Sequence, residues 1–69
     1  MALKLSYRPF RVKMADLGIS RKELEQATGI NKNTISRLYN DIDVSVGTLR
    51  TVCEYLECRI EDVVEFVPY

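Results

Sequence analysis

Residues 19–40, ISRKELEQATGINKNTISRLYN, constrain the fold more than any other stretch, because they predict two short helices joined by a tight turn. Ser20 and Glu23 have the S-x-x-E spacing of a capping box, which predicts a helix that begins at Ser20. Gly29 follows at a point where a chain that leaves a helix often needs a left-handed residue. Asn31 is a good N-cap for a second helix, since its side chain can accept a hydrogen bond from an unpaired N–H.

The second of these helices, expected at residues 31–40, has an apolar side and a polar side. Ile35 and Leu38 lie three residues apart on one face, as buried positions of a helix do. The opposite face gathers side chains that can form hydrogen bonds and are not acidic, namely Lys32, Asn33, Ser36, Arg37 and Asn40. A short helix with this distribution is suited to the major groove of DNA.

The spacing of apolar residues predicts three more helices, at about residues 8–17, 46–57 and 60–65. Pro9 suits the first turn of the first of them, and Ser45 is an N-cap for the second. Together with Ile35, Leu38 and Ile30, which can fill the turn, the residues expected in or against the core are Phe10, Met14, Leu17, Leu24, Ala27, Ile42, Val46, Leu49, Val52, Cys53 and Leu56.

Both ends of the chain carry short alternating patterns typical of strands. Leu3, Leu5 and Tyr7 alternate with polar residues, and Val64 and Phe66 begin a similar pattern near the carboxyl end. The two segments can pair either within one chain or between two chains.

The formal net charge is zero, but the two halves of the chain carry opposite charge. Residues 1–40 contain eight basic and three acidic residues, a net charge of +5, whereas residues 41–69 contain two basic and seven acidic residues, a net charge of −5. A basic half can face nucleic-acid phosphates while an acidic half points away from them. Chance segregation, or a surface of paired charges, is the alternative interpretation.

Length and hydropathy predict one folded domain over residues 1–69, with a small core. No apolar run approaches the about 18 residues that a membrane-spanning helix needs. The amino-terminal residues MALKLSYRPF have no secretory apolar core or cleavage site. We therefore expect a cytoplasmic protein without a membrane partner.

The residue types present also exclude several kinds of chemistry. The sequence has no histidine, no glycine-rich phosphate loop and no nucleophile with an accompanying base, so an enzyme is not expected. Cys53 and Cys58 lack a zinc-site spacing, and we expect reduced thiols packed as small apolar groups. No cofactor, metal or small-molecule ligand is expected.

Three motifs together resemble the Cro/C1-type helix-turn-helix family, also called the XRE or phage-repressor-like family. They are L-x-x-A-T-G-I-N-x-N-T-I-S-x-L-Y-N at residues 24–40, V-x-x-G-T-L-x-x-V-C-E-Y-L-E-C at residues 44–58, and D-V-V-E-F-V-P at residues 62–68. The resemblance is greatest to small stand-alone members. It implies an all-α, five-helix, lambda-repressor-like domain with its helix-turn-helix at residues 20–40, and short terminal strands that can pair. Glu25 departs from the family pattern, because a small residue is usual where the two helices touch. We expect its carboxylate to turn to solvent or to pair with Arg21, Lys22 or Arg37.

The resemblance implies sequence-specific binding to double-stranded DNA by a repressor-like transcriptional regulator, with helix 31–40 in the major groove. Its base-contacting positions correspond to Lys32, Asn33, Thr34 and Arg37, and its DNA-backbone-contacting positions to Ser20, Arg21, Ser36, Asn40 and Thr48. Two of these have a simpler interpretation, since Ser20 can serve only as a helix cap and Asn40 only as a helix end.

The function has one serious alternative, and so does the oligomeric state. Helix-turn-helix folds can act as antitoxins or adaptors, with the acidic carboxyl-terminal half docking on a protein. A homodimer is expected through the terminal segments, at Leu3, Leu5, Val64 and Phe66, because a single module offers limited specific area on DNA. The alternative is that these residues close the core of a monomer.

Overall fold

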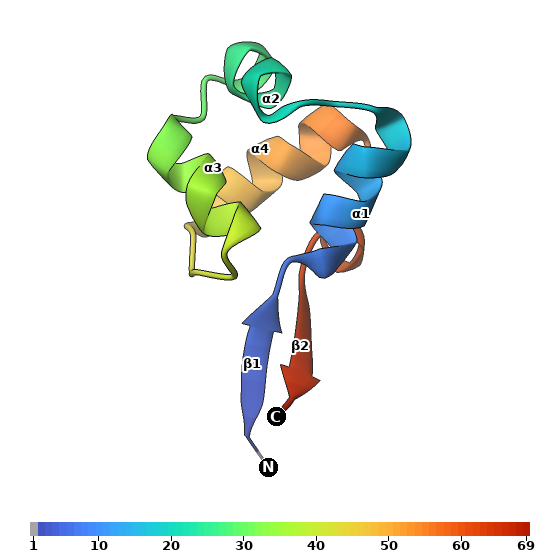
Figure 1. Ribbon diagram of the computed structural model, residues 1–69, viewed down its shortest axis with the longest axis vertical. Helices are drawn as coiled ribbons and strands as arrows, with labels where there is room; N and C mark the ends of the chain where they lie inside the picture. Colours follow the sequence, from blue (N-terminus) through green and yellow to red (C-terminus); the bar gives the residue numbers. More distant parts are fainter. Residues whose placement is uncertain (1) are drawn as a thin grey trace.

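Within residues 2–69, the part of the chain that the computed structural model describes, four short α-helices form a body from which a two-stranded ribbon extends (Figure 1). The elements follow in the order β1 (Leu3–Ser6), α1 (Arg8–Leu17), α2 (Arg21–Thr28), α3 (Lys32–Tyr39), α4 (Val46–Leu56), the 3-10 turn η1 (Ile60–Asp62) and β2 (Glu65–Pro68). The long axis measures 38 Å because the ribbon projects well beyond the helices.

Local hydrogen bonds set the ends of α2 and the start of α3, as the sequence predicts. The Ser20 hydroxyl accepts from the Glu23 N–H at 3.1 Å, and the Glu23 carboxylate accepts from the Ser20 N–H at 3.3 Å. Gly29 ends α2 in the left-handed conformation, at a φ of 77°. Asn31 caps α3, because its Oδ1 accepts from the Thr34 N–H at 2.8 Å. The expected capping box, turn and N-cap are therefore confirmed.

The core lies where the inner faces of the four helices meet. Leu24 comes from α2, Ile35 and Leu38 come from α3, and each is almost fully excluded from solvent. Together the buried apolar residues are Tyr7, Phe10, Met14, Leu24, Ile35, Leu38, Val52, Leu56 and Val63. The inner face of α3 thus belongs to the shared core, and its other face is left to the surface.

Four residues expected in the core are exposed instead, so those predictions are wrong. Leu17 and Val46, the last residue of α1 and the first of α4, are 54% and 81% exposed, because the end of a helix is covered less than its middle. Ile42 is exposed in the loop after α3, and Val44 takes the half-buried place there. Ala27 lies on the outer side of α2.

The expected fifth helix at residues 60–65 is only a 3-10 turn, Ile60–Asp62. Two competing demands end it. Val63 is fully buried and its carbonyl accepts from the Phe10 N–H at 3.2 Å, and the chain from Glu65 onward pairs in β2. The expected all-α, five-helix fold is therefore corrected, over residues 2–69, to a mostly helical domain with four helices, a 3-10 turn and a two-stranded sheet.

The terminal strands pair antiparallel within one chain, which decides between the two pairings that the sequence allows. Directly opposed residues of an antiparallel pair share a face of the sheet. Leu5 lies opposite Phe66, and Ser6 lies opposite Glu65, whose carboxylate accepts from the Ser6 hydroxyl at 3.4 Å. One face of the ribbon is accordingly apolar, with Leu3, Leu5, Phe66 and Pro68, and the other carries Lys4, Ser6, Glu65 and Val67.

Asp41 joins the start of α1 to the end of α3. Its Oδ1 accepts from the Tyr7 N–H and from Arg11 Nη1, both at 2.8 Å. Asp41 adopts a φ of 57°, which lets the chain reverse directly after α3. The hydrogen bond from Arg11, followed by that from the Tyr7 N–H, lowers the pKa of the Asp41 carboxyl.

Asp41→Asn is expected to reduce stability at neutral pH by up to about 1 kcal/mol, the usual range for a partly exposed ion pair. Asparagine tolerates the left-handed conformation and keeps an acceptor oxygen, so the change isolates the charge. A folded-state pKa below the ordinary 3.8 means that the stabilisation is present above that value and is lost as pH falls through the lowered pKa. Urea unfolding should therefore show a difference between wild type and variant that shrinks in acid. A difference that stays constant would contradict this assignment.

Candidate nucleic-acid interface

The turn between α2 and α3 is held by its own hydrogen bonds. The Thr28 hydroxyl donates to the Leu24 carbonyl at 2.6 Å and accepts from the Ile30 N–H at 3.2 Å. Ile30 is half-buried and packs against the core. The left-handed Gly29 and the packed Ile30 together set the turn that joins the two helices.

The outer face of α3 presents the residues predicted to contact bases. Lys32, Asn33 and Arg37 are exposed, and Thr34 is half-buried at the first turn of the helix. Arg37 is exposed and directly precedes the buried Leu38, so burial of Leu38 directs Arg37 toward the surface. The structure places these four side chains along a single helix, with Lys32, Asn33 and Thr34 in its first turn and Arg37 in its last.

Four of the five residues predicted to contact the DNA backbone already make hydrogen bonds within the chain. Ser20 caps α2, as described above, and the Asn40 amide donates to the Ser36 carbonyl at 2.8 Å and to the Ser36 hydroxyl at 3.2 Å. Ser45 caps α4, and its hydroxyl accepts from the Thr48 N–H at 3.1 Å. A hydroxyl that accepts one bond can still donate another, so these contacts leave room for a phosphate.

Arg21, the fifth of these residues, lies over an aromatic ring. Its guanidinium carbon is 3.9 Å from the centroid of Tyr39, the last residue of α3. The Tyr39 ring in turn meets the buried Phe10 edge to face, with centroids 5.5 Å apart and planes at 75°. Sequence reasoning missed this contact, because it joins two helices and leaves no periodic signal within either.

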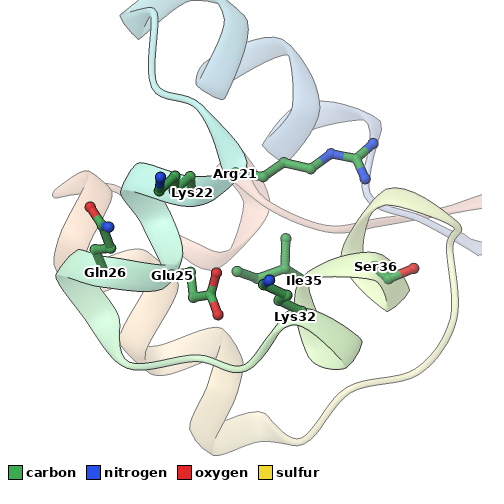
Figure 2. Close-up of a pocket in the computed structure, with 7 residues that line it drawn as sticks. All are labelled: Arg21, Lys22, Glu25, Gln26, Lys32, Ile35 and Ser36. Carbon is green, nitrogen blue, oxygen red and sulfur yellow. The ribbon is translucent and has the colours of Figure 1, made fainter.

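An open groove separates α2 from α3, and Glu25 lies in it (Figure 2). Figure 2 shows the Glu25 carboxylate directed into the groove on the side of Lys32, whereas the Arg21 side chain, which also lines the groove, points away from Glu25. Glu25 is only half-buried, and within residues 2–69 the one ion pair closer than 4.0 Å is Arg11–Asp41. Of the two expected outcomes, pairing with Arg21, Lys22 or Arg37 does not occur within these residues, and the carboxylate lies in a groove that is open to solvent.

The segregation of charge along the chain is only partly kept in space. Arg8 and Lys13 of α1 line the same surface hollow as Glu61, Asp62 and Glu65 of the acidic half. Positive charge on α1 is thus compensated locally. The exposed cations of α2 and α3 are Arg21, Lys22, Lys32 and Arg37, and the first three line the separate groove between those helices.

The two cysteines are free and half-buried against the core. Burial, followed by the proximity of Cys58, raises the pKa of the Cys53 thiol. Residues 2–69 contain no group of three or more side chains placed to hold a metal ion. None of the helices in the same range has the length and apolar character needed to cross a membrane.

Comparison with known proteins agrees with this geometry. Residues 10–69 match the family described as the Cro/C1-type HTH DNA-binding domain. The fold matches the crystal structure of transcriptional regulator VanUg, Form II, with a TM-score of 0.90 and 30% sequence identity, over 100% of this chain and 92% of that chain. A search of curated proteins finds no significant match. The chain belongs to the Cro/C1-type helix-turn-helix DNA-binding family and is similar to a transcriptional regulator.

Proposed function

We propose that this chain is a sequence-specific, repressor-like transcriptional regulator that inserts α3 into the major groove of double-stranded DNA. The observation that carries the proposal is the exposed Lys32, Asn33 and Arg37 on a helix whose other side is buried through Ile35 and Leu38. A fixed helix of this kind presents its polar side chains to base edges without a rearrangement of the core. The chain acts as one domain, in the cytoplasm.

The chemistry of each side chain assigns its role at the base edges. Arg37 has two parallel donors that fit guanine O6 and N7, and Asn33 can pair with adenine N6 and N7. Thr34 can offer its methyl group to thymine or its hydroxyl to a phosphate. Lys32, at the start of α3, reaches either a base or a phosphate.

Contacts to the DNA backbone would set the orientation of α3. Arg21 supplies a charged donor at the start of α2, beside the N-terminal N–H groups that attract anions. The remaining contacts are proposed for hydroxyl and amide groups around α3 and at the start of α4, namely Ser20, Ser36, Asn40 and Thr48. Such groups position a protein on DNA but do not read its sequence.

Selection from random duplex DNA, followed by titration of the recovered site at several salt concentrations, tests the function. We expect one enriched sequence and a steep loss of affinity with salt, because each neutralised phosphate releases counterions. Recovery of no sequence would overturn the proposal.

Charge reversal at Glu61 and Asp62 distinguishes DNA binding from an adaptor role. These residues lie on η1, outside the elements proposed to contact DNA, so the variant should still bind DNA. If the chain is an adaptor, the same variant should lose binding to its protein partner.

The proposal includes a homodimer, formed through the apolar face of the ribbon by a second copy of the chain. Leu3 and Phe66 are 53% and 68% exposed on this face, and Leu5 and Val64 are half-buried at its base. A two-stranded sheet has little stability of its own and leaves both outer edges unpaired. A symmetric dimer would protect this surface and present two copies of α3 to two half-sites.

Phe66→Glu is expected to convert the dimer to a monomer, because it places a carboxylate on the apolar face that the second copy would cover. Sedimentation velocity at micromolar concentration measures the mass directly. Lys4→Glu changes charge on the opposite face of the same ribbon and serves as the control that should leave the dimer intact. A wild-type protein that sediments only as a monomer would refute the dimer.

A further inference from the structure

We propose that Tyr39 is a positioning residue for DNA binding, and that its ring holds the Arg21 guanidinium ready to bind a phosphate. This inference rests on the proposed function, since it assigns a supporting residue to the same interface. It concerns a side chain that is itself half-buried and that lies outside the set of residues predicted to contact DNA.

Three side chains form a stack that runs from the core to the surface. Phe10 is fully buried, and its ring meets that of Tyr39 edge to face at 5.5 Å. Arg21 Cζ lies 3.9 Å above the centroid of the Tyr39 ring. Phe10 is held by the core, and its contact with Tyr39 restricts how the Tyr39 ring can turn. The ring in turn places the Arg21 guanidinium that lies over it.

The type of contact matters, because it leaves the hydrogen-bonding capacity of Arg21 unused. A guanidinium attracted to the face of an aromatic ring keeps its N–H donors in its own plane, where a phosphate can accept two of them. A carboxylate partner would instead occupy those donors. Within the described part of the chain, the one carboxylate–cation pair closer than 4.0 Å is elsewhere, between Arg11 and Asp41.

Preorganisation gives this contact a consequence for affinity. A free arginine side chain loses much rotamer freedom when it binds a ligand, and a side chain already held in place loses less. The contact also crosses the motif, from the first residue of α2 to the last residue of α3. The phosphate-binding group on α2 is therefore placed relative to the helix that enters the groove.

Duplex binding by Arg21→Ala, Tyr39→Leu, Tyr39→Phe and the double variant Arg21→Ala/Tyr39→Leu tests the inference. Tyr39→Leu keeps an apolar side chain but removes the ring, and we expect about threefold weaker binding. Both Arg21→Ala and Tyr39→Leu should reduce the salt slope, by up to about one for a lost phosphate contact. Tyr39→Phe keeps the ring face and should bind as the wild type does.

The double variant separates positioning from packing. If Tyr39 acts through Arg21, removal of the ring in the Arg21→Ala background should have no further effect. An equal loss in both backgrounds, or a Tyr39→Phe variant as weak as Tyr39→Leu, would overturn the inference while wild-type DNA binding stands. Failure of the wild type to bind any duplex would overturn the proposed function and this inference together. The Arg21 Nε–H resonance gives a second readout without DNA, since Tyr39→Leu should remove its ring-current shift and Tyr39→Phe should keep it.

Discussion

Replacement of Leu38 by alanine is expected to lower the free energy of unfolding by about 2–5 kcal/mol. Leu38 is fully buried on the inner side of α3, so the smaller side chain leaves a cavity between the helices. A chain of 69 residues has little stability in reserve, because domains of this size seldom exceed about 3–5 kcal/mol. Much of the Leu38→Ala protein should therefore be unfolded without denaturant, which circular dichroism at the α-helical wavelengths will detect.

Leu17→Ala is the matched control, because it removes the same carbon atoms from a residue with the right spacing for the core. Leu17 is 54% exposed at the end of α1, so Leu17→Ala should lower the free energy of unfolding by less than about 1 kcal/mol. Equal losses for the two variants would show that burial in the structure does not decide stability here.

The ends of α2 and the start of α3 could be predicted from the sequence because capping there is local. Ser20 and Glu23 complete their reciprocal hydrogen bonds within one turn, and Asn31 needs only the N–H of Thr34. Gly29 adopts the left-handed conformation that its position after α2 requires. None of these interactions depends on how distant parts of the chain pack.

The errors arise where the outcome depends on distant parts of the chain. Leu17 and Val46 fit the helical period, but whether a terminal residue is covered depends on the length and placement of neighbouring elements. Residues 60–65 have a plausible helical pattern. They form only a 3-10 turn, because Val63 is buried in the core and its carbonyl accepts a hydrogen bond from the Phe10 N–H. Both competing contacts lie far away in the sequence.

The candidate interface divides in the same way. The polar face of α3 follows from the helical period alone, once Ile35 and Leu38 fix the inner side. The stack of Arg21 on Tyr39 depends on the angle between two helices, and the open groove that accommodates Glu25 depends on it too. Patterns within a single helix carry no record of that angle.

Arg37→Ala is expected to weaken binding to the selected DNA site by about 1–3 kcal/mol and to relax specificity at one base pair. The guanidinium is the group on α3 that can donate two parallel bonds to guanine, and the exposed position lets alanine replace it without a cavity. The free energy of unfolding should stay within about 0.5 kcal/mol of wild type, the usual range for an exposed position. Leu38→Ala, one residue further on, should instead lower the free energy of unfolding, and its DNA binding should fall only in step with the loss of folded protein.

Affinities for a panel of duplexes, each with one base pair changed, distinguish the possible roles of Arg37. A base contact predicts that the variant loses discrimination at one position and keeps it at the others, whereas a phosphate contact predicts a uniform loss and a salt slope reduced by about one. Arg59→Ala is the matched control for charge, because Arg59 is exposed beside η1 and contributes its backbone N–H, not its side chain, to the bond with Asp62. If both variants lose the same affinity, net charge attracts the DNA and α3 does not read it. A loss confined to Arg37→Ala assigns base recognition to the outer face of α3.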